Sequence, residues 1–406
     1  MSGKRRILLA DADAFYVSVA RLTDPEGTRN PLLIVGGSAD RRGVVTSASY
    51  EARKFGVHSA MPMARALRLC PGATVVPVPW RACVEKSREI RRVLARFAPV
   101  VETASSDEYY LDMSGTERLY HDEPLGTTSL RIRDAVLAAT QVSVSVGGGS
   151  TKLVAKMAAT LAKPGGVHVV PEGGEEAFMR RFTLSELPMV GPRFQERLLR
   201  YNLRSVDDAL GVGRERLVQW LGEREGSWLW DRIHGVDASS VQGGGDPKSI
   251  SRDETFPADI DDDQALRQEL LELVDRAAGD MREEGFLART VTVRIRDADF
   301  KDRQASRTLD VPVLSDRAVL RIAKELLARL RAARRAPARL LGVALSSLVR
   351  EDGPAQLQLL DAPRPAAESE RDRAVSRAMD AVRHKLGDDS VALGRPPERS
   401  PRRRRV

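Results

Sequence analysis

The sequence predicts a multidomain protein of mixed α/β and α+β class, and three observations predict it. The chain has 406 residues, and at about 100–200 residues per domain this length gives two to four domains. Apolar residues make up 42% of the chain, which is enough for several cores and too many for global disorder. Short apolar strands alternate with amphipathic helices through residues 6–171, whereas residues 183–240 are helical throughout.

Charge and cysteine content exclude several classes of protein. The net charge is +8, but residues 395–406 alone hold six Arg and one Glu. The folded body is therefore weakly basic, and nucleic-acid binding has to depend on local patches. Cys70 and Cys83 are too few for a disulfide framework or a Cys-rich zinc site and suit a reducing cytosol. No apolar run approaches the roughly 18 residues of a membrane span or forms a signal-peptide core, so we expect a cytoplasmic protein.

The first module consists of two interleaved β-α-β units. Short apolar runs bounded by turns predict strands, and apolar residues spaced three and four apart predict helices. In order, the prediction is a strand at 6–10, a helix at 14–22, a strand at 31–37, a strand leading into a helix at 42–57, a helix at 61–72, a strand at 73–79, a helix at 83–98, a strand-turn-strand at 100–115, a helix at 127–139, a strand at 141–146, a helix at 150–166 and a strand at 167–171.

Two local features of this module carry separate predictions. The three glycines at residues 147–149 are a weak signal for a phosphate loop, and we interpret them as a tight turn. The helix at residues 83–98 has an apolar side made of Val84, Ile90, Val93, Leu94 and Phe97.

The second half of the chain has a different pattern. Residues 183–240 are short helices, and the Gly/Pro-rich residues 241–249 form a tether. In residues 289–296 the alternation places Val291, Val293 and Ile295 inward. The remaining predicted elements are a helix at 261–281 with Leu266, Leu270, Leu273 and Ala277 on one face, a helix at 315–335, a strand at 340–349 and a helix at 370–386.

Three carboxylates interrupt apolar strands of the first module. Asp11 ends the first strand, and Asp107 and Glu108 break the strand-turn-strand. Carboxylates beside a core are costly unless a cation neutralises them. Oxygen ligands suit Mg²⁺, and two such ions can support in-line displacement at phosphorus. The alternative is that these acids cap helices or lie in exposed turns. To the nearby acids Asp13 and Asp112 we assign a structural role.

Four ordered motifs then identify a family resemblance. DADAFYVSV, SASYEARKFGVHSAMP, SSDEYYLDMSG and SVGGGSTKLVAKMAATLAKPGG resemble the Y-family DNA polymerases, and within that family the bacterial DNA polymerase IV (DinB-like) branch. The resemblance covers roughly residues 6–350. It implies a right-hand polymerase with a palm of mixed β-sheet and helices at 1–12 and 81–170, small fingers at 13–80, a helix-hairpin-helix thumb at 171–240, a linker at 241–250, an α+β little finger at 251–350 and a tail at 351–406.

The resemblance implies a metal and nucleotide site. Asp11, Asp107 and Glu108 would be the catalytic residues and would bind two Mg²⁺ ions together with the carbonyl oxygen of Ala12. The residues implied for dNTP binding are Phe15 and Tyr16 under the sugar, with Tyr16 excluding a ribose 2′-OH, and Tyr50, Arg53 and Lys163 on the triphosphate. Taken alone, Tyr16 could be a core residue, and Lys163 could be a contact to the end of a helix dipole.

The nascent base pair would lie under two small residues, Val44 and Thr46. A small roof would admit bulky or damaged templates. The chain departs from the family pattern at three positions: Ser106 stands where Ile is usual, Tyr109 where a small residue is usual, and Thr151 where Asn is usual. None of these departures removes a metal ligand, but each could change template packing and fidelity.

Two regions are implied to hold DNA. Residues 184–203 resemble a helix-hairpin-helix that presents backbone N–H groups to a phosphate, with Gly191 kept and Met189 in place of the usual first glycine. A solvated sheet face is the alternative for the basic residues of the little finger. In the family this strand follows the duplex backbone, which implies salt-dependent DNA contacts from Arg289, Arg294, Arg296, Lys301, Arg303 and Arg307.

The tail contains a segment similar to the sliding-clamp peptide of bacterial polymerases. It runs from Gln356 through Leu357, Gln358 and Leu359 to Leu360, which replaces the usual aromatic residue. A stray apolar patch in a linker is the alternative. The arginines at 402–405 either hold DNA loosely or solvate the end of the chain.

The predicted function is translesion DNA synthesis. The enzyme would add dNTPs to a primer 3′-OH on a template, with low fidelity and without a proofreading exonuclease, as a monomer at the nucleoid of a bacterial-type cell. A catalytically silent DNA-binding scaffold and another two-metal palm enzyme, such as a nucleotide cyclase, are the alternatives. Primer extension distinguishes the three.

Overall fold

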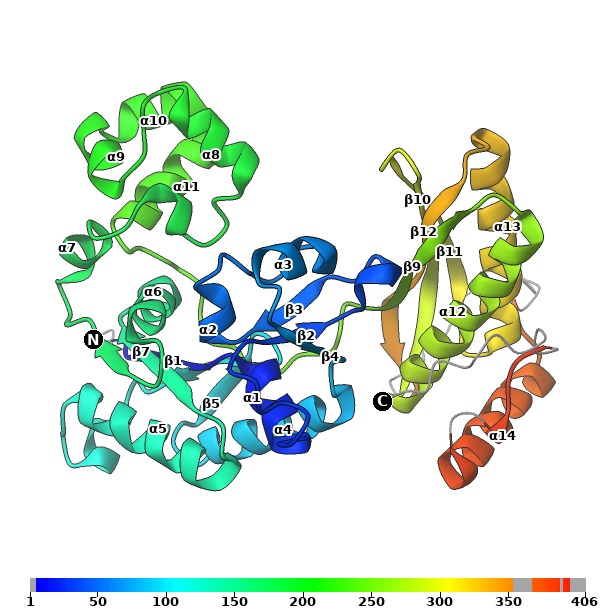
Figure 1. Ribbon diagram of the computed structural model, residues 1–406, viewed down its shortest axis with the longest axis horizontal. Helices are drawn as coiled ribbons and strands as arrows, with labels where there is room; N and C mark the ends of the chain where they lie inside the picture. Colours follow the sequence, from blue (N-terminus) through cyan, green and yellow to red (C-terminus); the bar gives the residue numbers. More distant parts are fainter. Residues whose placement is uncertain (1–4, 353–366, 388–389, 395–406) are drawn as a thin grey trace, which may run out of the picture. The chain divides into compact units, whose positions relative to one another are not determined.

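A computed structural model describes residues 5–352, 367–387 and 390–394 (Figure 1). The chain forms two compact units, one built from residues up to Gly245 and one from Asp246 onward, which also includes the short segment Ser38–Gly43. In the described ranges, no helix is long and apolar enough to cross a membrane.

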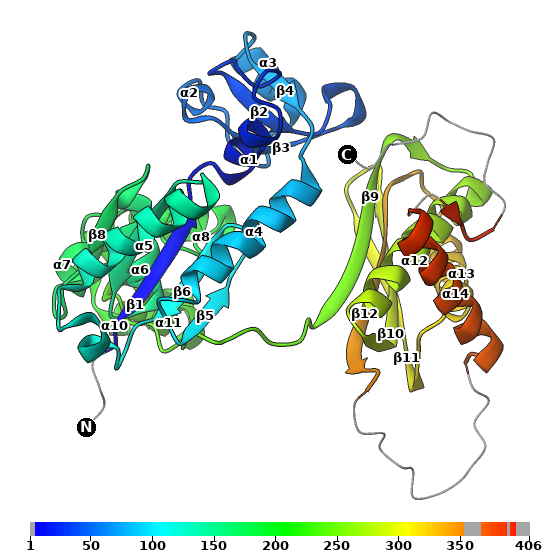
Figure 2. The same cartoon turned by 90° about the horizontal axis from the view of Figure 1, so that it is seen from below.

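A five-stranded sheet is the centre of the first unit. Its strand order is β5-β6-β1-β7-β8, and both neighbours of β1 run antiparallel to it. Every residue of β1 is buried, and Figure 2 shows this strand running through the sheet. The bounds are β1 (Ile7–Ala12), β5 (Val100–Thr103), β6 (Glu108–Asp112), β7 (Val144–Gly149) and β8 (Val167–Val169).

Helices cover both faces of this sheet. Leu8 and Ala10 of β1 belong to the core shared with α4 (Trp80–Leu94) and α5 (Leu125–Thr140). Ile7 and Leu9 belong instead to a core with Ala155 and Ala159 of α6 (Lys152–Ala162). Because side chains alternate along a strand, Asp11 lies on the α6 face of the sheet.

The prediction of a tight turn at the three glycines is wrong. Gly147, Gly148 and Gly149 are the buried end of β7. A Cβ on Gly147 would lie 2.0 Å from the backbone nitrogen of Ala159 and 2.1 Å from the carbonyl oxygen of Ala155. The glycine therefore allows α6 to pack backbone against backbone on the strand, which a pattern of turn residues cannot reveal.

The helix predicted at residues 83–98 is also corrected in part. α4 begins at Trp80, and Val84, which we placed on its apolar side, is 48% exposed. Ile90, Val93 and Leu94 are buried as predicted.

A smaller sheet and three helices occupy the range predicted for the fingers. Its strand order is β3-β2-β4, with β2 and β4 parallel. The bounds are α1 (Phe15–Thr23), β2 (Leu33–Gly36), β3 (Val45–Ala48), α2 (Tyr50–Arg53), α3 (Met63–Leu69) and β4 (Thr74–Val76).

The helical prediction for residues 183–240 is confirmed. These helices share one core, which Trp220, Trp228 and Trp230 flank. The bounds are α7 (Glu175–Met179), α8 (Pro192–Leu199), α9 (Val206–Val212), α10 (Arg214–Leu221) and α11 (Glu223–Ile233).

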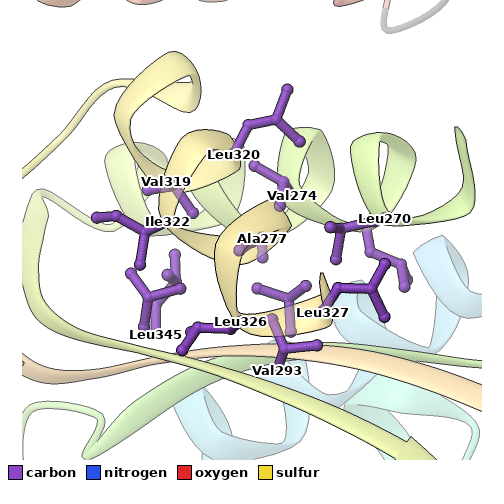
Figure 3. Close-up of a cluster of buried hydrophobic side chains, with 14 of the residues drawn as sticks. Leu270, Val274, Ala277, Val293, Val319, Leu320, Ile322, Leu326, Leu327 and Leu345 are labelled. Atoms are coloured by element: carbon purple, nitrogen blue, oxygen red, sulfur yellow. The ribbon is translucent and has the colours of Figure 1, made fainter. Parts of the chain in front are cut away.

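The second unit is a four-stranded antiparallel sheet covered on one face by two long helices. Its order is β11-β10-β12-β9, with β9 (Ser249–Ile260), β10 (Phe286–Asp297), β11 (Asp302–Val313) and β12 (Ala338–Arg350). Figure 3 shows side chains of the helices α12 (Asp263–Glu283) and α13 (Asp316–Ala333) packed against the strands. The predicted inward positions Val291, Val293 and Ile295 are fully buried.

β9 is a strand that the sequence did not predict. It begins in the tether at Ser249 and contains Pro257, which a strand tolerates at the edge of a sheet. β9 is an edge strand of this sheet.

The predicted helix at residues 370–386 is α14 (Glu370–Leu386), and polar contacts attach it to the second unit. Arg282 on α12 bonds Asp380 on α14 and Asp316 on α13, and Arg383 on α14 pairs with Asp275 on α12. Figure 2 shows α14 beside these helices.

Candidate active site

The strand register brings the three predicted metal ligands to one end of the central sheet. Asp11 on β1 is the direct cross-strand partner of Glu108 on β6. The backbone N–H of Ala12 donates to the carbonyl oxygen of Asp107 at 2.9 Å. Residues separated by almost a hundred positions in the chain thus become neighbours through strand pairing.

Two lysines on α6 and a third directly after it pair with carboxylates of this sheet. Lys163, just after the helix, lies 2.5 Å from Asp11, and Lys156 donates to both carboxylate oxygens of Glu108 at 2.7 Å. Lys152 pairs in the same way with Glu102 at 2.6 Å. The sequence analysis did not identify Lys156, although its spacing from Lys152 places both on one helical face.

Burial dominates the electrostatics of Asp11, which is 8% exposed. Desolvation raises the pKa of this carboxyl group, and Lys163 acts in the opposite direction through its charge and its hydrogen bond. The negative charges of Glu108 and Asp107 raise the pKa of Asp11 further. The three carboxylates are therefore close enough to repel one another.

The donor set fits a hard divalent cation. In the parts of the chain that the structure describes, no group of three Asp, Glu, His or Cys side chains is already placed to bind a metal ion. Each carboxylate instead has a protein partner, which for Asp107 is the Ser105 hydroxyl at 2.6 Å. Carboxylate and carbonyl oxygens are the ligands that Mg²⁺ prefers, so an ion can bind if it replaces these partners.

Asp13 is a buried hydrogen-bond centre beside the carboxylates. One of its oxygens accepts from the hydroxyls of Tyr50 at 3.2 Å and Ser145 at 2.8 Å. The other accepts from Ser143 at 2.7 Å and from the backbone N–H of Gly165 at 2.9 Å. Asp13 therefore fixes the position of Tyr50 and the loop after Lys163, the structural role that the sequence analysis assigned without finding these partners.

The predicted triphosphate residues Tyr50 and Arg53 contact each other. The Arg53 guanidinium lies 5.0 Å from the centre of the Tyr50 ring, and its Nε donates to the carbonyl oxygen of Ala48 at 2.9 Å. Burial, followed by the charge of Asp13, raises the pKa of Tyr50, so its hydroxyl stays protonated at neutral pH.

The two predicted sugar-contacting residues differ in exposure. Phe15 is 1% exposed and belongs to the core under the sheet. Tyr16 is partly exposed, and its ring packs edge-on against Phe15 at 5.3 Å and Trp80 at 5.9 Å. Its hydroxyl lies 2.9 Å from the Ser106 hydroxyl, a contact that the sequence analysis did not foresee.

The two residues predicted over the nascent base pair lie at the edge of the small sheet. Val44 is 48% exposed and forms an isolated bridge with Pro62. Thr46 is half-buried on β3.

The predicted hairpin lies at the start of α8. Gly191 is the residue before the helix, with Pro192 in its first turn. Met189, which replaces the usual glycine, is 82% exposed and has a φ of 71°, a left-handed conformation that glycine adopts without strain.

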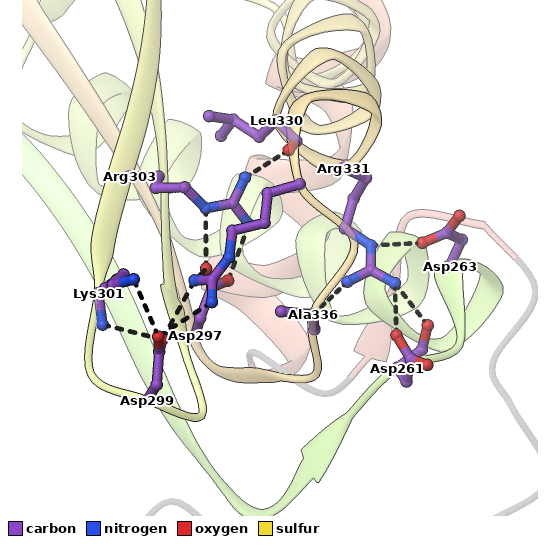
Figure 4. Close-up of polar contacts among 10 residues, drawn as sticks. Asp261, Asp263, Asp297, Asp299, Lys301, Arg303, Leu330, Arg331 and Ala336 are labelled. Atoms are coloured by element: carbon purple, nitrogen blue, oxygen red, sulfur yellow. Dashed lines mark hydrogen bonds and ion pairs between the residues drawn. The ribbon is translucent and has the colours of Figure 1, made fainter.

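Five of the six basic residues predicted to contact DNA have acidic partners, and the sixth, Arg289, donates to the backbone carbonyl oxygen of Asp310. Arg303 donates to both oxygens of the fully buried Asp297 and to the carbonyl oxygen of Leu330, as Figure 4 shows. The other pairs are Arg294 with Asp253, Arg296 with Asp302, Lys301 with Asp299 and Arg307 with Glu325.

These pairs differ in exposure. The side chains of Lys301 and Arg307 are 70% and 53% exposed, against 18% for Arg303. The donors of Arg303 are therefore used inside the domain, whereas Lys301 and Arg307 can reach solvent. The predicted clamp residues Gln356, Leu357, Leu359 and Leu360 and the arginines at 402–405 lie outside the described residues.

Comparison with known proteins agrees with this arrangement. Residues 10–160 match the model of the impB/mucB/samB family, and residues 247–359 match that of its C-terminal domain. The chain is 34% identical to a DNA polymerase IV of Dehalococcoides mccartyi, over 96% of this chain and 97% of that protein. It is 35% identical to a DNA polymerase IV of Caulobacter vibrioides, over 97% and 94%.

Solved structures show the same fold. A Y-family DNA polymerase chimera of Dbh and Dpo4 matches with a TM-score of 0.75 and 24% identity, over 85% of this chain and 99% of the chimera. An insertion ternary complex of Dbh DNA polymerase matches with a TM-score of 0.60 and 23% identity, over 85% and 99%.

Proposed function

This chain belongs to the Y-family of DNA polymerases, the impB/mucB/samB family, and from that premise we propose how its own residues carry out DNA synthesis. It is a DNA-directed DNA polymerase of the translesion type and depends on a divalent metal ion. The observation that carries the proposal is the pairing of Asp11 with Glu108 across β1 and β6, with Asp107 tied to the same strand end.

We assign the metal site to Asp11, Asp107, Glu108 and the carbonyl oxygen of Ala12, and the metal to two Mg²⁺ ions. When bound, the ions supply charge neutralisation of the triphosphate and activation of the primer 3′-OH. Lys163 lies within reach of the same carboxylates and offers a positive charge to the phosphates. Arg53 and Tyr50 offer further hydrogen bonds from α2, and Asp13 holds Tyr50 in place.

Selection of the nucleotide is assigned to two groups of residues. The Tyr16 ring under the sugar leaves no room for a ribose 2′-OH, and Phe15 supports that ring from the core. Val44 and Thr46 form a small roof over the nascent base pair, which is the basis we propose for low fidelity and tolerance of damaged templates. We further propose that the enzyme has no proofreading exonuclease.

Primer-template DNA is held by the second unit and by the hairpin at Gly191. Lys301, Arg307, Arg294 and Arg296 are the proposed phosphate contacts, because their side chains are at least one-third exposed. Each must exchange its present acidic partner for a phosphate. Arg303 supports this surface from inside through Asp297.

Three statements about partners and location complete the proposal. The segment from Gln356 to Leu360 docks on a sliding clamp. The enzyme acts as a monomer on DNA. It works in the cytoplasm, at the nucleoid of a bacterial-type cell.

Primer extension with Mg²⁺ tests the proposed site. Wild type is compared with Asp107→Asn and with the matched control Asp112→Asn, an acid of β6 whose carboxylate accepts from the backbone of Ser114. Extension by wild type and by the control, together with its loss in Asp107→Asn, is the expected result. Extension that persists in Asp107→Asn would move the catalytic metal site elsewhere.

A further inference from the structure

Two departures from the family pattern, Ser106 and Tyr109, meet the Tyr16 ring in one hydrogen-bond network. The Ser106 hydroxyl lies 2.9 Å from the Tyr16 hydroxyl, and either oxygen can donate. An Ile at this position would have no donor or acceptor. The contact to the tyrosine is therefore a consequence of the serine that this chain has here.

Tyr109 fixes the backbone that carries Ser106. The Tyr109 side chain is fully buried, and its hydroxyl donates to the carbonyl oxygen of Ser106 at 2.8 Å. The same hydroxyl lies 2.7 Å from the Ser87 hydroxyl of α4.

The Tyr16 ring is thus held on two sides by contacts of different kinds. Phe15 and Trp80 pack against its ring in T-shaped contacts, which limits its tilt. Ser106 holds the hydroxyl at the opposite end of the ring, the end farthest from the backbone. Apolar packing alone leaves a ring free to slide in its plane, whereas a hydrogen bond to the hydroxyl fixes its distal end.

We propose that Ser106 is a positioning residue for Tyr16 and that the Ser106–Tyr16 hydrogen bond strengthens the exclusion of ribonucleotides. The inference rests on the proposed role of Tyr16 under the incoming sugar. Exclusion by a ring depends on how firmly the ring holds its place, because a ring that can move aside makes room for a 2′-OH. Tyr109 acts on Tyr16 only indirectly, because its hydroxyl holds the backbone carbonyl of Ser106 in place.

The test is a double-mutant cycle on sugar selectivity. Single-turnover incorporation gives the efficiency ratio of each dNTP to its NTP for wild type, Ser106→Ala, Tyr16→Phe and the double variant. Each single change is expected to lower this ratio by roughly two- to ten-fold, the factor that one intramolecular hydrogen bond corresponds to. The double variant is expected to equal either single variant, since both remove the same bond. Ser106→Thr, which keeps the hydroxyl, should restore the wild-type ratio.

Two controls separate this inference from loss of structure. Ser129→Ala removes a buried serine hydroxyl that donates to the Leu125 carbonyl oxygen within α5, and it should leave the ratio unchanged. The thermal midpoint of each variant is measured alongside. A selectivity ratio unchanged in Ser106→Ala, or effects of Ser106→Ala and Tyr16→Phe that add, would overturn the inference.

A further variant separates this inference from the proposed function. Tyr16→Ala removes the whole ring and should allow efficient NTP use. If it does so while Ser106→Ala has no effect, the positioning role alone fails. If Tyr16→Ala does not admit NTPs, the assignment of Tyr16 to the sugar fails, and the positioning role fails with it.

Discussion

Lys156 donates to both carboxylate oxygens of Glu108 at 2.7 Å, so a residue of the proposed metal site is already neutralised by a side chain of α6. The lysine holds this carboxylate in place before an ion arrives. It also occupies the oxygens that the ion needs. The two effects are opposed, and they can be measured separately.

The first prediction concerns metal affinity. In Lys156→Met, Glu108 loses its competing cation, and the pair is only partly buried, so divalent-ion affinity should rise by roughly two- to five-fold. Mn²⁺ binding to the DNA-free protein, followed by electron paramagnetic resonance, measures it. Lys152→Met is the matched control, because Lys152 pairs with Glu102, which is not a proposed ligand. Equal affinities in wild type and Lys156→Met would show that the lysine does not compete.

The second prediction concerns stability and pH. Burial raises the pKa of Asp11 in the folded state, so ionising this group costs more there than in the unfolded chain. The cost is fully present above the raised pKa, shrinks as the pH falls through it, and is absent below the ordinary value of 3.8. Metal-free Asp11→Asn should therefore melt at a higher temperature than wild type at pH 8, and the difference in melting temperature should narrow as the pH falls toward 3.8.

Tryptophan fluorescence measures this difference, since all four tryptophans lie in the first unit with Asp11. A gap in melting temperature that widens on acidification would reverse the assigned pKa direction.

The third prediction uses two neighbouring glycines of β7. An added Cβ on Gly147 meets backbone atoms of α6 at 2.0 and 2.1 Å, whereas one on Gly148 first meets the flexible end of Leu8 at 2.8 Å. Gly147→Ala should displace α6, cost about 1–3 kcal/mol or more and strongly reduce primer extension. Gly148→Ala should be milder in both measurements. A Gly147→Ala enzyme with normal activity would contradict the close packing of α6.

The fourth prediction concerns the buried ion pair between α12 and α13. The side chains of Arg282 and Asp316 are 4% and 1% exposed, so Arg282→Met leaves a buried carboxylate without its main partner and should cost about 3–5 kcal/mol. Arg317→Met removes an arginine that is 83% exposed and should cost about 0–1 kcal/mol. The second unit has no tryptophan to report on unfolding. Hydrogen exchange of the backbone amides of β10 and α12 therefore measures the loss of stability in the two variants. If the two variants lost similar amounts of stability, the buried position of the Arg282–Asp316 pair would not explain its contribution.

The fifth prediction concerns DNA binding. Lys301→Ala and Arg307→Ala should each lower the slope of log affinity against log salt by about 1, as expected for the loss of one phosphate contact. Arg303→Ala should leave the slope unchanged and destabilise the second unit, because its guanidinium is bound to Asp297 and Leu330. Fluorescence anisotropy on a primer-template duplex from low to high salt gives the slopes. A lower slope for Arg303→Ala alone would reverse the assignment.

Much of the fold was predictable because its signals are local. Alternation along residues 289–296 predicted the inward side of β10, and helical spacing predicted α12 and its buried leucines. The glycines of β7 were misread because their role depends on α6, which follows them in the chain and packs back on the strand. β9 escaped notice because its pairing partner, β12, lies about eighty residues further on.

In the candidate site, too, local motifs were predictable and contacts between distant residues were not. Asp11, Asp107 and Glu108 were identified from motifs, and the strand register brings them together. The partners of Asp13, the Lys156 pair and the Ser106–Tyr16 contact join residues from different elements, so no sequence pattern contains them. The acidic partners of Arg296 and Arg303 were missed for the same reason, since a charge on a predicted strand does not indicate what it pairs with.

The close contact at Gly147 has one more consequence. Lys152 and Lys156 lie on α6 and Lys163 follows its last residue, and at Gly147 the helix rests directly on the backbone of β7 with no side chain between them. A shift of α6 toward the sheet at this point would drive backbone into backbone, so the close contact at Gly147 limits how Lys156 can be placed relative to Glu108.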